Sequence, residues 1–276
     1  MELTNTKQLF SLQDKIAVVT GGTGVLGQAM VKGLVSAGAS VAILGRRLEV
    51  AEALAKEVQS AGGKAIGVSA DVIDKEQLLR AKEIVHKHLG PIDILVNAAG
   101  GNMAGAVIAP DKNFFDLNIE DFQKVVDLNL LGTVLPTQVL TDDMAKRKKG
   151  VVVNITSMSS FRPITRVVGY SAAKAAVENF TQWMAIEMAK KFGEGVRVNA
   201  IAPGFFLTEQ NRNLLTNPDG SYTARGQAAI NQTPFARFGK PEELVGTLIW
   251  LCSDAAAFVT GVDVPVDGGF NVFCGV

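Results

Sequence analysis

The sequence contains few residues that bind metals or form disulfides. Among its 276 residues are two cysteines and two histidines. Cys252 and Cys274 fit no metal-binding or redox spacing. His86 and His88 lie two positions apart on a predicted helix, so they point in different directions and we expect both to face solvent. The sequence therefore predicts no metal site and indicates a reduced, cytoplasmic protein.

The chain also lacks an excess of charge and any long apolar run. Lys and Arg number 27, as do Asp and Glu, and no run of basic residues is present. The start, MELTNTKQLFSLQDK, has neither the basic beginning nor the apolar stretch of a signal peptide. No segment approaches the roughly 18 uninterrupted apolar residues of a membrane helix. We therefore expect no nucleic-acid partner and no association with a membrane.

What the sequence does contain is a regular alternation of apolar and helical segments. Hydrophobic residues make up 47% of the chain, enough for a sizeable core. Short runs rich in Val and Ile predict strands at 16–19, 41–44, 65–68, 92–96, 151–155, 196–201 and 262–266. Helical periodicity lies between them, at 25–38, 49–61, 74–89, from an N-cap near Asn118 onward, 171–192 and 241–251.

These elements predict one fold class. The strands are apolar throughout, as strands covered on both faces should be. Repeated βαβ units with right-handed crossovers predict an α/β fold of the Rossmann type, a doubly wound parallel sheet of about seven strands with helices on both faces. No linker divides the chain, so we expect a single domain over residues 1–276, with 1–13 as an N-terminal extension. Ligands of such a fold bind beyond the carboxyl ends of the strands.

A glycine-rich turn follows the first predicted strand. Residues 20–27 are TGGTGVLG, in which Gly22, Gly24 and Gly27 match the G-x-G-x-x-G spacing. Glycines let the backbone approach a pyrophosphate, and the following helix N-terminus offers unpaired N–H groups and a favourable dipole. The motif predicts a dinucleotide site; the alternative is a tight strand–helix turn that binds nothing.

The end of the second predicted strand bears on which dinucleotide binds. An acid at this place usually holds the ribose hydroxyls of NAD, but here the strand ends in Gly45, Arg46 and Arg47. A guanidinium pairs with a phosphate and stacks on a flat base. We therefore predict that NADP is favoured over NAD. The alternative is that Arg46 and Arg47 are solvated loop charges.

A tyrosine and a lysine, Tyr170 and Lys174 of YSAAK, stand one helical turn apart. A free tyrosine has a pKa of about 10, but a nearby ammonium and a positive nicotinamide ring both stabilise the phenolate. Ser157, after the predicted strand 151–155, is placed to hydrogen-bond a reacting oxygen, unless it only caps a helix. Asn129 lies among apolar residues and needs partners, such as a water that reaches Lys174.

With these residues the sequence resembles the short-chain dehydrogenase/reductase family from residue 20 to residue 269. Family motifs appear in order: Asp71-Val72, NAAG, VNAIAPG, RFGKPEE and a final VDGG. The resemblance implies four catalytic residues, Ser157, Tyr170, Lys174 and Asn129. It also implies cofactor contacts from Gly21, Gly22, Thr23, Gly24, Val25, Leu26, Gly27, Arg46, Arg47, Asp71, Val72, Asn97, Ala98, Ala99, Gly100, Tyr170, Lys174, Pro203, Gly204 and Thr208.

The glycine spacing departs from that of the compact members of this family. Those members have T-G-x-x-x-G-x-G, which asks for glycine where this chain has Val25 and places Gly24 one position early. The spacing observed equals that of the longer, extended members. Three features favour the compact branch, to which we assign the chain: its length, YSAAK and the Pro203-Gly204 motif.

A closer resemblance is to the D-mannonate oxidoreductases, or fructuronate reductases, with the gluconate 5-dehydrogenases as near neighbours. It rests on TGGTGVLG, the doubled glycine before Asn102, the insertion through Phe115 and the ending VDGGFNVF. Both groups act on sugar acids, which implies a sugar-acid substrate, with D-mannonate and D-fructuronate favoured, and a cationic contact for its carboxylate. Four arginines lie in suitable stretches and none is singled out: Arg162, Arg166, Arg212 and Arg225.

Two segments are predicted to enclose that substrate. The stretch 204–237 is long and rich in Asn, Gln and Thr, which suits a lid over a polyhydroxylated ligand. The insertion 102–112 is expected to form the opposite wall. A plain hydrophilic surface loop would have the same composition.

The resemblance implies hydride transfer between NAD(P) and a carbonyl or secondary alcohol. Tyr170 then donates the proton, Ser157 orients the oxygen, Lys174 lowers the pKa of Tyr170, and Asn129 holds a water. The alternatives are an epimerase or dehydratase on the same scaffold, and a dinucleotide-binding protein without turnover. In this family the helix equivalent to 171–192 packs against another subunit and the C-terminal strand makes a second interface, which implies a homotetramer, or at least a dimer.

Overall fold

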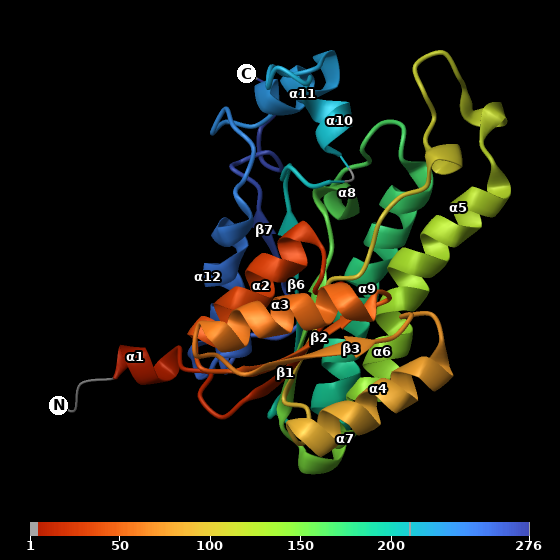
Figure 1. The fold of residues 1–276 in the computed structure, drawn as a ribbon. Helices are drawn as coiled ribbons and strands as arrows, with labels where there is room; N and C mark the ends of the chain where they lie inside the picture. Colours follow the sequence, from red (N-terminus) through yellow and green to blue (C-terminus); the bar gives the residue numbers. More distant parts are fainter. Residues whose placement is uncertain (1–4, 210, 276) are drawn as a thin grey trace.

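The computed structural model describes residues 5–209 and 211–275, which form a seven-stranded parallel sheet (Figure 1). The strand order across the sheet is β3-β2-β1-β4-β5-β6-β7, so the winding direction reverses between β1 and β4. The strands are β1 (Ile16–Thr20), β2 (Ser40–Gly45), β3 (Ala65–Ser69), β4 (Ile94–Asn97), β5 (Gly150–Ile155), β6 (Val196–Pro203) and β7 (Asp263–Val266). Open α/β sheets bind their ligands at such a reversal.

Helices cover both faces of the sheet. One face packs against α2 (Val25–Ser36), α3 (Leu48–Ser60) and α12 (Val245–Cys252). The other packs against α4 (Lys75–His88), α6 (Gly132–Leu140) and α9 (Val168–Phe192). Successive strand residues point to opposite faces, so Val18 and Val19 enter different core clusters. This is why most strand residues are apolar and do not alternate with polar ones.

The predicted fold class is confirmed, as are the main elements. Each predicted strand begins and ends within two residues of an observed one. Asn118 caps α5 (Ile119–Val126), because its side chain accepts a hydrogen bond from the Asp121 N–H at 3.0 Å. A π-helical turn, η3 (Asp127–Leu131), then leads into α6. Helix α9 begins three residues earlier than predicted, so Tyr170 lies inside it.

Short helices lie beyond the carboxyl ends of the strands, where the sequence predicted only loops. Three of them, α8 (Met158–Phe161), α10 (Arg212–Leu215) and α11 (Ala224–Asn231), gather at the top of Figure 1. The other short elements are α7 (Asp142–Arg147), η1 (Ala104–Ala106), η2 (Phe114–Asp116), η4 (Pro241–Leu244) and η5 (Asp254–Ala256). Helices α8, α10 and α11 form the roof of the cavity described below.

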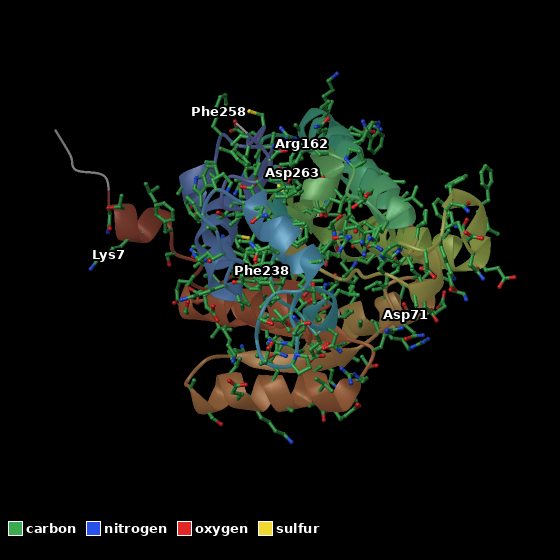
Figure 2. All side chains as sticks on the ribbon, turned by 90° about the horizontal axis from the view of Figure 1, so that it is seen from above. Lys7, Asp71, Arg162, Phe238, Phe258 and Asp263 are labelled. Atoms are coloured by element: carbon green, nitrogen blue, oxygen red, sulfur yellow. The ribbon has the colours of Figure 1, made fainter. Side chains whose placement is uncertain are left out.

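The N-terminal extension is shorter than predicted. Helix α1 (Thr6–Leu9) projects from the body of the molecule, as the position of Lys7 shows (Figures 1 and 2). Leu12, however, is fully buried in the core, and its N–H donates to the Ala37 carbonyl at 2.8 Å. The residues just before β1 therefore belong to the packed domain.

The prediction for the two histidines is correct only for His88, which is exposed. His86 is half-buried, and its Nε2 lies 2.7 Å from a carboxylate oxygen of Asp143. Asp143 belongs to α7, an element that the sequence did not predict, so the pairing had no visible signal. No helix in residues 5–209 and 211–275 is both long enough and apolar enough to cross a membrane.

Candidate active site

The glycine turn after β1 is shaped by two glycines that cannot be replaced without a clash. Gly21 has φ +63°, and a Cβ there would lie 2.7 Å from the Ala99 Cα. A Cβ on Gly27 would collide with the Gly21 carbonyl oxygen. Gly24 differs, because a Cβ there would meet only that same oxygen, at an ordinary 3.4 Å. Gly24 therefore has no packing role, and its place is the N-cap of α2, with no side chain capping the helix.

A groove of about 640 Å³ opens from this turn across the carboxyl ends of β1, β2 and β4. Its lining comprises Gly21, Thr23, Gly24, Val25, Leu26, Gly27, Leu44, Gly45, Arg46, Arg47, Ala70, Asp71, Val72, Ala98, Ala99, Gly100, Leu128, Thr208 and Glu209. The uncapped start of α2 and the backbone of the glycine turn thus face one elongated space. Such an N–H-rich cradle fits the pyrophosphate of a dinucleotide.

The end of β2 carries no acidic residue and is followed by two arginines. A Cβ on Gly45 would lie 3.0 Å from the Thr23 hydroxyl, so a longer side chain there requires Thr23 to move. Arg46 and Arg47 are exposed on the groove and form no ion pair with the residues that the structure describes. Both guanidiniums are therefore available to a negatively charged ligand.

Two of the predicted cofactor residues stand behind the groove rather than in its lining. Gly22 packs under the turn, and its N–H donates to the Leu44 carbonyl at 3.2 Å. Asn97 is buried, and its amide donates to Asn154 Oδ1 and to Thr137 Oγ1, each at 2.9 Å. Both residues shape the strand ends that carry the groove. The other predicted cofactor residues line the groove or the cavity beside it.

That neighbouring cavity, of about 300 Å³, brings the four predicted catalytic residues together. Tyr170 and Lys174 project from α9 one turn apart, and Ser157 lies at the end of β5, where it caps α8. The Ser157 hydroxyl is close enough to Tyr170 to lower the pKa of the phenol, against the larger effect of burial. Asn129 reaches the cavity from the π-helical turn. Elements from three parts of the chain thus converge on one space.

Burial dominates the electrostatics of Tyr170 and Lys174. Burial lowers the pKa of Lys174 from 10.5 to about 8, while the carboxylate of Asp263 acts in the opposite direction. The Lys174 Nζ donates to the Ile155 carbonyl at 2.7 Å and lies 5.7 Å from the centre of the Tyr170 ring. Burial raises the pKa of Tyr170, and the nearby Ser157 hydroxyl only partly offsets this. The lowered tyrosine pKa that the sequence predicted is therefore absent from the protein alone.

The Asn129 side chain forms hydrogen bonds to the backbone of the protein. Its Oδ1 accepts from the Gly101 N–H at 3.2 Å, and its Nδ2 donates to the carbonyls of Gly101 and Val125 at 2.7 and 2.8 Å. A Cβ on Gly100 would lie 2.7 Å from the same Oδ1. Asn129 therefore holds the turn that separates the groove from the cavity. That it also positions a water remains a prediction.

The outer wall of the cavity is less polar than the composition of segment 204–237 suggested. This segment contributes Phe205, Phe206, Thr208, Asn211, Leu214, Leu215 and Arg225 to the lining. Several of its amides instead form hydrogen bonds within the segment, as in the 2.8 Å bond from Gln227 to Asn231. From the predicted opposite wall, the cavity receives Asn102 alone of residues 102–112.

Of the four candidate arginines, only Arg225 lines the cavity. Its Nη2 makes one long contact, 3.4 Å, with the Thr165 carbonyl. Arg162 lies outside and donates to the Phe273 carbonyl at 3.2 Å, and Arg212 is exposed on α10. The sequence could not separate these four, because which of them faces the cavity depends on the unpredicted helices α10 and α11.

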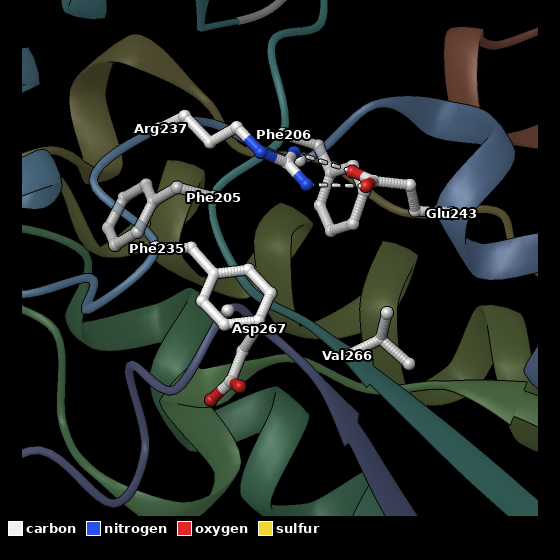
Figure 3. Close-up of a pocket in the computed structure, with 9 residues that line it drawn as sticks. Phe205, Phe206, Phe235, Arg237, Glu243, Val266 and Asp267 are labelled. Carbon is white, nitrogen blue, oxygen red and sulfur yellow. Dashed lines mark hydrogen bonds and ion pairs between the residues drawn. The ribbon is translucent and has the colours of Figure 1, made fainter.

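A smaller cavity of about 140 Å³ adjoins the site, and its charged side chains already have partners; Figure 3 shows the pair formed by Arg237 and Glu243. Arg237 binds both carboxylate oxygens of Glu243, at 2.8 and 2.6 Å, which lowers the pKa of Glu243 to about 2. Asp267 accepts from the N–H groups of Gly269 and Asn271. The RFGKPEE motif therefore anchors the end of segment 204–237 to η4. Its Arg237 and Glu243 side chains pair with each other and are not free to bind a charged ligand.

Comparison with known proteins gives consistent results. The sequence profile of the short-chain dehydrogenases matches residues 15–219. A Bacillus subtilis protein described as an uncharacterized oxidoreductase is 46% identical over 275 residues, covering 96% of this chain and 98% of that protein. A Haemophilus influenzae structure with bound NAD, provisionally described as a D-mannonate oxidoreductase, is 39% identical, with a TM-score of 0.91 and coverage of 99% and 100%. A Burkholderia cenocepacia gluconate 5-dehydrogenase in complex with NADP and tartrate is 31% identical, with a TM-score of 0.88 and coverage of 98% and 100%.

Proposed function

This chain belongs to the short-chain dehydrogenase/reductase family and is a nicotinamide-dependent oxidoreductase, and we propose that its substrate is a sugar acid. The reaction interconverts a ketone and a secondary alcohol. D-Fructuronate and D-mannonate are the first candidate pair, and 5-ketogluconate and gluconate are the second.

The proposed mechanism assigns each residue of the cavity a step. The groove would hold a nicotinamide dinucleotide, whose ring would supply or accept the hydride. During reduction Tyr170 donates its phenolic proton to the carbonyl oxygen, and Ser157 donates a hydrogen bond to the same oxygen. The resulting phenolate needs a positive charge, which Lys174 and the oxidised ring provide together. Because burial raises the pKa of Tyr170 in the protein alone, the phenol stays protonated until it donates its proton to the carbonyl oxygen during hydride transfer.

One observation carries the assignment to acids: the catalytic cavity is positively charged. Among the described residues that line it, Lys174 and Arg225 carry positive charge, and no Asp or Glu contributes. The surface as a whole has no such bias, because acidic and basic residues balance over the chain. A cavity with low-dielectric walls and charge of one sign favours a ligand of the opposite sign.

The relatives support the same substrate class. Two structures that match nearly the whole chain are described as a gluconate 5-dehydrogenase and, provisionally, as a D-mannonate oxidoreductase. Other relatives indicate a competing class, since a 3-oxoacyl-[acyl-carrier-protein] reductase of Aquifex aeolicus is 37% identical over 259 residues. The apolar side chains of Phe205, Leu214 and Leu215 suit that class, so the assay must include an apolar ketone.

For the cofactor we propose a preference for NADP over NAD. Arg46 and Arg47 lie on the groove without acidic partners among the described residues, and Gly45 stands where an acid would select NAD and would require Thr23 to move. The 39% identical structure holds NAD and the 31% identical one holds NADP, so similarity does not decide between them. Local charge favours the 2′-phosphate.

The experiment compares three ketones with both cofactors by following the absorbance of the reduced nicotinamide. We expect D-fructuronate or 5-ketogluconate to have the highest kcat/KM. The third ketone is a hydrophobic 3-oxoacyl ester. A far higher kcat/KM for that ester would overturn the sugar-acid assignment and leave the oxidoreductase activity intact.

A further inference from the structure

We infer that Arg225 is the binding site for the carboxylate of the substrate, an assignment that rests on the proposed function. It makes Arg225 the residue that separates sugar acids from neutral sugars. Ser157, Tyr170 and Lys174 act at the carbonyl and cannot make that distinction.

The backbone around Arg225 is fixed in place. Arg225 lies in the first turn of α11, where the Thr223 side chain caps the helix by accepting from the Gly226 N–H at 3.1 Å. A Cβ on Gly226 would collide with the Leu215 carbonyl, so α11 lies directly against α10. Both helices belong to the roof of the cavity, whereas Tyr170 and Ser157 belong to its floor. A substrate between them meets Arg225 and Tyr170 with different ends.

This geometry suits the candidate substrates. In D-fructuronate and 5-ketogluconate, three carbons separate the carboxylate carbon from the ketone carbon. An extended acid can therefore present its ketone to Tyr170 while its carboxylate stays at a separate wall. Guanidinium groups bind carboxylates through two parallel N–H donors, which fixes orientation as well as charge.

The charge of Arg225 has no partner within the protein. A guanidinium has five N–H donors, yet the described contacts of Arg225 amount to the single 3.4 Å bond to the Thr165 carbonyl. No ion pair to Arg225 forms among the described residues. Its pKa is lowered by burial and also by the neighbouring cation Arg166. A partly buried cation beside a second cation is stabilised by an anion.

Arg166 is held near this site at a conformational cost. Its backbone has φ +75°, a value that non-glycine residues rarely adopt, and its carbonyl accepts from the Ile108 N–H at 2.9 Å. The loop before α9 is thus tied to the insertion that follows β4. Because Arg166 is absent from the cavity lining, we assign it a supporting field and Arg225 the direct contact.

The test compares D-fructuronate with D-fructose, in which a CH₂OH group replaces the carboxylate. We expect Arg225→Met to lower the ratio of kcat/KM for the acid to that for the neutral sugar by about ten- to a hundredfold, mainly through KM. Arg225→Lys should restore part of that ratio, because an ammonium keeps the charge but loses the paired donors. Arg212→Met removes the same charge from an exposed position of the same segment and should leave the ratio unchanged.

A second measurement separates this inference from the proposed function. Tartrate, an unreactive hydroxy acid in this assay, should inhibit the wild type competitively against whichever ketone it reduces, and should inhibit Arg225→Met at least tenfold more weakly. If the wild type prefers a neutral ketone, the proposed function fails. If Arg225→Met retains both the full acid preference and the full inhibition by tartrate, the assignment of Arg225 is wrong. Cofactor titration and thermal melting verify that each variant is folded.

Discussion

At the scale of single residues, Tyr170 and Lys174 are held in states that oppose their expected chemistry. Burial favours the neutral phenol and weakens the hold of Lys174 on its proton. The Lys174 Nζ is directed to a backbone carbonyl, not to the phenolic oxygen. The protein therefore supplies the placement of these groups, and in the mechanism we propose a bound oxidised nicotinamide would supply the further positive charge that the phenolate needs.

Replacing Tyr170 tests its role as the proton donor. We expect Tyr170→Phe to keep the fold and the affinity for cofactor but to lose at least about 10²-fold in turnover, the usual contribution of general acid–base catalysis. The chain offers a matched control in its only other tyrosine, Tyr222, which lies outside the cavity against Phe238. Tyr222→Phe should turn over at the wild-type rate. Near-normal turnover by Tyr170→Phe would remove Tyr170 from the mechanism.

Lys174 should leave a signature in the pH dependence of stability. Its pKa is about 8 in the folded protein and 10.5 as the ordinary value, so between these pH values the unfolded chain binds more protons than the folded one. The contribution of Lys174 to stability therefore rises with pH across that window. At pH 7 the buried ammonium makes the wild type less stable relative to Lys174→Met.

The measurement is the free energy of unfolding of the cofactor-free wild type and of Lys174→Met by urea titration. The advantage of the Met variant should shrink by about 3 kcal/mol between pH 8 and pH 10.5, since one pKa unit corresponds to about 1.4 kcal/mol. Groups that do not interact with Lys174 cancel in the difference between the two proteins, and the pKa of Asp263, about 7, lies below this pH window. A difference that stays constant with pH would show that Lys174 is not shifted.

The charges of Arg46 and Arg47 should decide the cofactor preference. A charge-assisted contact with the 2′-phosphate contributes about 1.5–3 kcal/mol, which corresponds to a ten- to hundredfold preference for NADP. Replacing both arginines with alanine should erase most of that preference, measured as the ratio of the Kd values for NADP and NAD. Lys56→Ala, on the following helix α3, removes one positive charge outside the groove lining and serves as the control. Equal or tighter binding of NAD by the wild type would contradict the proposal.

At the scale of elements, the sequence predicted those whose burial leaves a pattern. Most strand residues are apolar because helices cover both faces of the sheet, and Asn118 caps α5 as its residue type indicates. Helices α8 and α10 have only four residues each, too few to show a hydrophobic period. They are stabilised by tertiary contacts beyond the strand ends. For this reason the four candidate catalytic residues, which lie in or next to predicted elements, could be named from the sequence, whereas Arg225 could not be separated from Arg212.

The glycine turn allows packing and ligand binding to be tested separately. Gly27→Ala should destabilise the fold by about 1–3 kcal/mol, because the new Cβ collides with the backbone of the preceding turn. Gly24→Ala has room for its Cβ and should cost no more than about 1 kcal/mol as a poorer N-cap. Its main effect should be weaker NADP binding, if the backbone passes close to the pyrophosphate at this point. Unchanged binding by Gly24→Ala would place the pyrophosphate elsewhere along the turn.

At the scale of the whole molecule, the reversal of strand order explains why the site has its composition. Neighbouring strand ends β4 and β5 are joined by the Asn97–Asn154 hydrogen bond, and the Thr20 hydroxyl of β1 accepts from the N–H groups of Ala98 and Ala99. These buried bonds fix the floor on which the groove and the cavity meet. The roof comes from segments after β5 and β6, so it can vary with the substrate while the floor stays the same.

The outer face of α9 leads to a prediction about assembly. Trp183 and Ile186 are 57% and 58% exposed, although they lie on the long helix that carries Tyr170. Large apolar side chains grouped on one helix face mark an interaction surface. We therefore expect a homotetramer, with this helix packed against its counterpart in a second subunit. Light scattering at micromolar concentration should give about four times the chain mass of 29.2 kDa.

Trp183→Glu combined with Ile186→Glu should reduce the particle to a dimer or less, because charges would be buried in the interface. Leu79→Glu, at an exposed position of α4, should leave the assembly intact, and a monomeric wild type would show that the face of α9 has another role.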